Sequence, residues 1–312
     1  MAFSTTPTSP TTPARFGLTV DQLHLLQSRC PGITLPAEFQ SAWGAEVADN
    51  ERDERMLVAE LGLIDQSLLR AVPTDAPADA PADDFTARVH PAVLGFLGLF
   101  TEPALLLAVH SWGGGRTIVQ IIAVRAGFAA SLVRGQRLDD HGTHPANEDA
   151  VELSAFPVSA LIGETLRSLV RLEPKTSTPA PRGRPASVVL PLTLAQGMIG
   201  AIRTGSPEII HAAALEVGLP QAEQVLTGPA FGIDAGYSVA ATSLTGDTLA
   251  VHWFRSAHGW FQMSADTPLV GRIESTVDVV DSSRVRIETT GPAAITGQVT
   301  TAIGSLLGVL RG

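Results

Sequence analysis

Residues 151–172 (VELSAFPVSALIGETLRSLVRL) and residues 285–307 (VRIETTGPAAITGQVTTAIGSLL) decide the fold, because both follow one plan. Each begins with the alternation of apolar and polar residues that is typical of a strand, then passes through a polar stretch with a proline, and ends in an amphipathic helix. The helix of the second segment is expected to bury Ile295, Val299, Ile303 and Leu306. A strand-helix unit that occurs twice indicates an internal duplication.

The strands expected before these two segments also resemble each other. Residues 107–112 (LAVHSW) are similar to residues 249–253 (LAVHW), and further strand-like runs are bounded by turns such as Gly113-Gly114-Gly115. We therefore predict an α+β fold with a quasi-two-fold duplicated unit, in which a central antiparallel β-sheet is flanked by helical bundles. A chance match of short apolar stretches is the alternative to a duplication.

Composition sets the predicted boundaries along the chain. Residues 1–15 are rich in Ser, Thr and Pro and are expected to form a disordered tail, and residues 173–187 (EPKTSTPAPRGRPAS) are expected to be a linker. Residues 16–172 and 188–312 are then the two halves of one shared globular domain. The first half is expected to contain a helix capped by Thr19 and a longer helix over 51–72, and the second half helices between 192 and 226.

Charge and cysteine usage exclude several classes of partner. Lys plus Arg total 21 against 31 Asp plus Glu, and the formal charge of −10 disfavours nucleic acid. The longest apolar runs are far shorter than the roughly 20 residues that span a bilayer. The chain has a single cysteine, Cys30, and so needs no oxidising compartment for a disulfide. We expect a cytoplasmic protein that is a monomer or a homodimer and is not inserted in a membrane.

One loop carries residues that could hold a metal. His141 and His144 stand among Asp139, Asp140, Glu148 and Asp149, which are ligand types that a transition metal accepts. A metal-dependent hydrolase is therefore an alternative function, although Pro145 and Asn147 suit an ordinary solvated turn. The sequence contains no Gly-x-Ser-x-Gly, no P-loop and no dinucleotide-binding glycine pattern. We expect neither a cofactor nor enzymatic activity.

Aromatic residues gather in the stretch from Val251 to Met263 (VHWFRSAHGWFQM), which is expected to be a hairpin. In a hairpin one alternate set of side chains faces the core and the other faces outward. Trp, Phe, Met and Arg are enriched at protein interfaces, so this hairpin is the candidate docking surface. The alternative is that most of these rings pack beneath the helices.

The order of these segments resembles the EspG family. The resemblance covers roughly residues 50–310 and is carried by Thr101-Glu-Pro103, residues 106–109, Val151-Glu-Leu, the Pro-rich linker and Gly271-Arg272. It implies a cytoplasmic chaperone of the type VII (ESX) secretion system that holds the helical tip of a PPE protein, in a PE–PPE pair, within a groove and without a cofactor. Family members bind through the central sheet and the C-terminal helical part. By position, the resemblance implies partner-binding roles for Arg116, Trp253, Arg255, Trp260 and Gln262.

Two features depart from typical members of that family: the long Ser/Thr/Pro tail and the Asp/Ala/Pro loop over 74–84. They leave open whether the client is a PE–PPE pair or another helical type VII substrate. A scaffold that assembles with itself through a sheet edge is the other non-enzymatic alternative.

Overall fold

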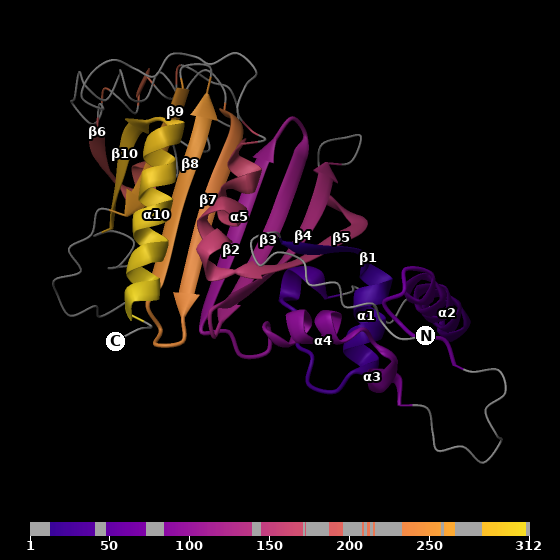
Figure 1. The fold of residues 1–312 in the computed structure, drawn as a ribbon. Coiled ribbons are helices and arrows are strands. Elements are labelled where there is room, and N and C mark those ends of the chain that lie inside the picture. Colours follow the sequence, from indigo (N-terminus) through magenta and orange to yellow (C-terminus); the bar gives the residue numbers. More distant parts are fainter. Residues whose placement is uncertain are drawn as a thin grey trace, which may run out of the picture. The chain divides into compact units, whose positions relative to one another are not determined.

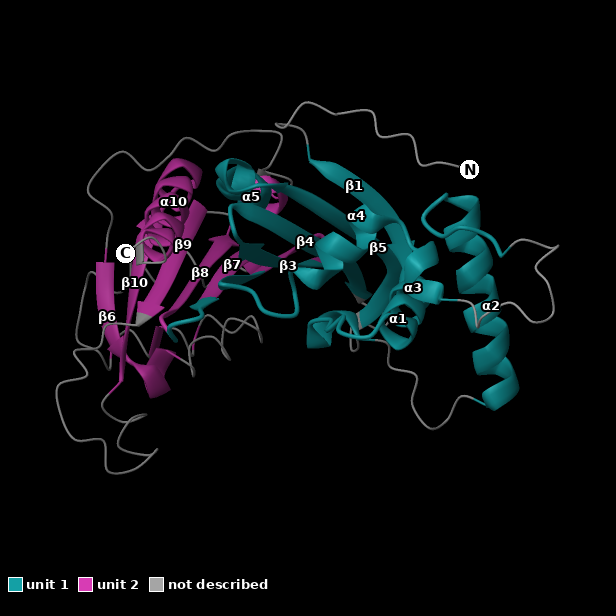
Figure 2. Cartoon of the chain, turned by 60° about the horizontal axis from the view of Figure 1, so that its bottom comes forward, with its two compact units in different colours: residues 1–108, 118–165, 242–246 teal, residues 109–117, 166–241, 247–312 magenta. Residues whose placement is uncertain are grey.

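The computed structural model describes residues 13–40, 48–72, 84–138, 145–170, 172, 187–195, 208, 211–212, 215, 233–256, 259–265 and 283–309. The chain divides into two compact units, which Figure 2 colours separately. Unit 1 comprises residues 1–108, 118–165 and 242–246, and unit 2 comprises residues 109–117, 166–241 and 247–312. Both units combine helices with antiparallel strands, which confirms the predicted α+β class.

Unit 1 is built on the strand order β1-β5-β4-β3-β2, of which β2 to β5 are consecutive in the chain. The strands are β1 (Ala14–Thr19), β2 (Leu105–Gly113), β3 (Arg116–Arg125), β4 (Phe128–Leu138) and β5 (Pro145–Pro157). The helices are α1 (Val20–Arg29), α2 (Asp49–Asp65), α3 (Phe85–Arg88), α4 (Pro91–Gly98) and α5 (Leu161–Val170), whose last turns belong to unit 2. Short 3-10 turns lie at Ala37–Phe39 and Val158–Ala160.

The start of α1 has the cap that the sequence predicts. The Thr19 hydroxyl accepts a hydrogen bond from the backbone N–H of Gln22 at 3.1 Å, and the Gln22 side chain accepts one from the backbone N–H of Thr19 at 2.9 Å. This reciprocal pair satisfies two N–H groups that the first turn leaves unpaired. The helix ends at Arg29, and Gly32 follows with a φ of 90°.

The core of unit 1 lies between the N-terminal helices and one face of its strands. Leu23 of α1 and Val93 of α4 are fully buried, as are Leu132 and Leu153 on β4 and β5. On the other face, the Gln120 amide donates to Ser131 Oγ at 2.9 Å and to the backbone carbonyl of Glu164 in α5 at 3.4 Å. Strand β3 is therefore covered on both faces.

Unit 2 has the strand order β7-β8-β9-β10-β6, and the last residues of β2 lie beside β7. The elements are β6 (Ser187–Pro191), β7 (Ile233–Ser243), β8 (Thr248–Ser256), β9 (Gly259–Ala265), β10 (Arg284–Thr290) and α10 (Pro292–Val309). Figure 1 shows α10 running along the strands of this unit. The four apolar positions predicted for its buried face are confirmed, because Ile295, Val299, Ile303 and Leu306 are all buried.

Several boundaries differ from the sequence analysis. Ala14 and Arg15, which were assigned to the tail, begin β1, where Ala14 pairs with Ala155 and Thr19 with Ala150 of β5. Ser187, assigned to the linker, begins β6. These short strands are stabilised by distant partners, so local composition does not indicate them.

One helix limit also differs from the sequence analysis. Helix α2 ends at Asp65 rather than near residue 72, and Ser67 follows with a φ of 60°.

Other predicted features fall outside the described residues. They include most of the helices between 192 and 226 and the loop with His141 and His144. Apart from the residues that begin β1 and β6, the predicted limits of the tail, the linker and the two halves stay predictions. Among the helices that the structure describes, none has the length and apolar character to cross a membrane.

Candidate docking surface

The register of the β8–β9 hairpin separates its side chains into two sets. Trp253 pairs with Gln262 and Arg255 with Trp260, whereas Phe254 pairs with Phe261. Because directly opposed residues of an antiparallel pair project from the same side of the sheet, the first four share one face and the two phenylalanines lie on the other. The residues proposed from the sequence for partner binding on this hairpin thus all belong to one face.

That face lies beneath α10. The indole N–H of Trp253 donates to Gln298 Oε1 of α10 at 3.0 Å, and the Gln298 amide donates to Gln262 Oε1. The Tyr237 ring of β7 stacks on Trp253 with 5.7 Å between the ring centroids. Trp253 is 1% exposed, so helix α10 and its strand neighbours cover it.

Arg255 is fixed at the end of the same face. Its Nε lies 2.9 Å from Asp234 Oδ1 and its Nη2 3.1 Å from Asp234 Oδ2, a two-pronged ion pair between β8 and β7. The guanidinium also lies over the Trp260 ring, 5.9 Å from its centroid. Trp260 and Gln262 are buried. Direct contact between these residues and a partner stays a prediction, and their burial supports the alternative that the rings pack beneath a helix.

The opposite face of unit 2 carries a row of three rings, Trp112, Phe254 and Phe261, which we call the aromatic row. The centroids of Trp112 and Phe254 are 6.4 Å apart, and those of Phe254 and Phe261 are 5.5 Å apart with the rings stacked. Trp112 and Phe254 are half-buried, and Phe261 is buried. The row therefore presents two partly accessible rings on a base of packed aromatic side chains, which suits contact with apolar side chains of another molecule.

A glycine on the neighbouring strand makes room for the row. A Cβ at Gly236 of β7 would overlap the indole of Trp112. The sheet can therefore accept the Trp112 ring flat against β7 because the residue beneath it has no side chain.

Two histidines lie on the same face. Desolvation lowers the pKa of His252 below its usual value, and the neighbouring His110 lowers it further because two imidazolium charges repel. His252 is therefore held towards its neutral form, in which it adds no charge beside the rings.

Arg116 lies elsewhere, at the exposed start of β3. It follows a two-residue turn in which Gly114 and Gly115 have φ values of 61° and 75°, the left-handed conformation that glycine adopts without strain. The predicted hairpin at this place is confirmed. Its role in partner binding stays a prediction.

Sequence reasoning missed Trp112, Phe254 and Phe261 as a cluster. The alternation of β8 and β9 was visible, but it does not say which alternate set a helix will cover. Trp112 comes from a strand distant in sequence, so its position beside Phe254 depends on the sheet order.

Among the residues that the structure describes, no group of three or more His, Cys, Asp or Glu side chains is placed to hold a metal ion.

Comparison with known proteins gives a fold and no sequence relative. No protein-family model matches the chain, and no curated protein matches it. A chain in the solved structure of the Mycobacterium tuberculosis type VII secretion system chaperone EspG5 in complex with the PE25-PPE41 dimer matches with a TM-score of 0.59 and 11% identity. The match covers 93% of this chain and 96% of that chain. At this identity the likeness shows that the chain has an EspG-like fold.

Proposed function

We propose that this protein is a cytoplasmic secretion chaperone that binds the helical tip of a type VII secretion substrate, a PPE-like protein, and keeps it soluble and ready for export. The observation that carries the proposal is the likeness of fold over 93% of this chain to a chain in a complex of such a chaperone with a PE-PPE dimer.

The aromatic row supports the proposal physically. An apolar helical tip would bury its side chains against Trp112 and Phe254, which are partly accessible and rigidly packed. Rigid rings lose little conformational entropy on binding, so they favour complex formation more than flexible side chains of equal area. Trp253, Trp260 and Gln262 would act through the hairpin that carries Phe254, rather than by contact with the client.

The test is co-purification of the full chain with a PE–PPE-type dimer from the source organism, followed by titration of the purified partners. Trp112→Ala and Phe254→Ala are each expected to weaken binding by at least about tenfold, the effect of losing an interface anchor of about 1.4 kcal/mol or more. Phe128→Ala is the matched control, because Phe128 is 62% exposed and belongs to unit 1. It should leave the affinity within about twofold.

Two results would contradict the proposal. One is that the unaltered protein neither binds any such dimer nor keeps its PPE-like subunit soluble on co-expression. The other is that both ring variants bind as well as the Phe128→Ala control. Thermal unfolding of each variant separates a lost contact from a lost fold.

A further inference from the structure

Helix α2 in unit 1 is more apolar than its packing requires. Residues 56–64 (MLVAELGLI) include seven apolar residues, although a helix on the surface of a core needs one apolar face. Ala59 and Leu63 form that face, with exposed fractions of 3% and 0%. Leu57, Val58 and Leu61 are 58%, 63% and 56% exposed. Their spacing places them together along one side of the helix, where they form an apolar stripe.

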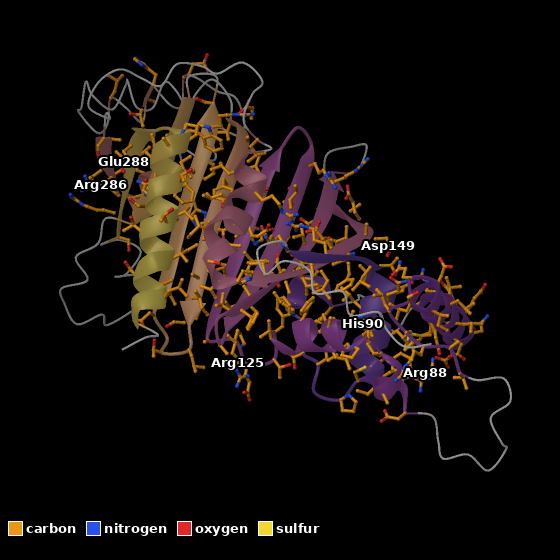
Figure 3. The ribbon with its side chains drawn as sticks, in the orientation of Figure 1. Arg88, His90, Arg125, Asp149, Arg286 and Glu288 are labelled. Atoms are coloured by element: carbon orange, nitrogen blue, oxygen red, sulfur yellow. The ribbon has the colours of Figure 1, made fainter. Side chains whose placement is uncertain are left out.

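A groove beside this stripe is acidic. It has a volume of about 500 Å³ and is lined by the first turn of α1, one face of α2 and Asp149 of β5, which Figure 3 labels. Its lining includes the carboxylates of Asp21, Glu51, Glu54 and Asp149 and one guanidinium, that of Arg55, which gives a formal charge of −3. Arg55 pairs with Glu51 at 3.2 Å. Val58 belongs both to the stripe and to the groove.

We propose that the apolar stripe and the acidic groove together bind a basic amphipathic helix of a partner protein. The apolar side of such a helix would cover Leu57, Val58 and Leu61, and its lysines or arginines would face Asp21, Glu54 and Asp149. Helix α2 has 17 residues and is therefore about 25 Å long, enough to support a partner helix of four turns or more. The site lies wholly in unit 1, so it is separate from the aromatic row of unit 2.

The negative charge of the groove favours a basic partner helix over two other possible occupants of the site. In a symmetric contact with a second copy of this chain, the acidic groove of one molecule would face that of the other, and the like charges would repel. An anionic membrane surface would be repelled in the same way, and the formal charge of −10 on the whole chain adds to both effects. A basic helix is attracted by the same groove.

The test uses two synthetic 18-residue helical peptides with the same leucine stripe, one with lysine and one with glutamate on its polar side. Fluorescence anisotropy measures the binding of each labelled peptide to the full chain. The lysine peptide is expected to bind saturably, and the glutamate peptide at least about tenfold more weakly. Leu57→Gln with Leu61→Gln, and separately Glu54→Lys with Asp149→Lys, should each weaken the lysine peptide by at least about tenfold.

The control variants carry the same types of substitution at positions outside the proposed site. Asp53→Lys alters the charge of an exposed position of α2 that does not line the groove, and Leu244→Gln alters a leucine that is 78% exposed elsewhere. Both should leave the affinity within about twofold. Equal losses of affinity in Asp53→Lys and in the variant with Glu54→Lys and Asp149→Lys would mean unspecific charge attraction and would overturn the proposal. Two further results would also overturn the proposal. One is that the lysine peptide does not bind saturably, and the other is that the protein associates with itself and the Leu57→Gln and Leu61→Gln changes abolish this association.

Discussion

Gln298 connects helix α10 to two strands through one side chain. Its carbonyl oxygen accepts from Trp253 on β8, and its amide donates to Gln262 on β9. Trp253 and Gln262 are both buried, so neither lost hydrogen bond could be replaced freely by water.

We therefore expect Gln298→Leu to lower the free energy of unfolding by about 1–3 kcal/mol, the cost of buried polar groups without a partner. Urea unfolding followed by tryptophan fluorescence measures it. Ser305→Ala is the control, since Ser305 is exposed on the same helix. A Gln298→Leu protein as stable as this control would show that the bridge contributes nothing.

Gly236 controls the position of a ring. A methyl group there would overlap the Trp112 indole, so Gly236→Ala is expected to destabilise the protein by about 1–3 kcal/mol, as overpacking does. The double variant Gly236→Ala with Trp112→Ala should recover much of this loss, because the clash then has no second partner. If the two single effects simply add, the overlap is not the cause.

His252 makes stability depend on pH. Its pKa is lowered in the folded protein, first by desolvation and second by His110, so below about pH 6.5 the unfolded chain binds a proton more readily than the folded chain does. Stability therefore falls as the pH falls from 7.5 to 5.5.

Urea unfolding at the two pH values measures this dependence. His252→Gln should reduce the difference in unfolding free energy between them. An unchanged difference would assign the pH dependence to other groups.

Helix α10 contains glycines that its packing does not need. A Cβ at Gly297 or Gly304 would meet no atom within 4 Å. Gly297→Ala and Gly304→Ala should each raise the free energy of unfolding by about 0.5–1 kcal/mol, because alanine restricts the unfolded chain and favours the helix. Thermal unfolding checks this. A loss of stability in either variant would indicate that α10 is held differently from the packing described above.

The elements that could be predicted from the sequence are those with a local signal. Thr19, a capping residue, indicates where α1 begins, and the spacing of the apolar residues from Ile295 to Leu306 indicates the buried face of α10. Strand β1 has no such signal, since it exists through pairing with β5 about 135 residues away in the chain. For the same reason the alternation of β8 and β9 did not indicate which of the two faces of this hairpin α10 covers. Only the sheet order and the placement of α10 show that Trp253 lies on the covered face and Phe254 on the other face.

The whole molecule carries probes for both units. Cys30 is the single cysteine and is 1% exposed in unit 1, where burial raises the pKa of its thiol and slows its reaction. Trp253 and Trp260 are buried in unit 2. Strand β2 contributes Leu105–Ala108 to unit 1 and Val109–Gly113 to unit 2, so we expect one cooperative transition. In a Trp43→Phe variant, whose remaining tryptophans all belong to unit 2, thiol reactivity and tryptophan fluorescence should then share one urea midpoint. Two midpoints would show that the units unfold independently.

The division of each unit into three stretches of chain has a consequence for the gene. No single segment of coding sequence specifies one unit without the other. A contiguous piece of the gene that carries the whole of one unit therefore also carries part of the other. Selection can then replace the scaffold as a whole, or adjust individual codons within it, but a single exchange cannot replace one unit alone.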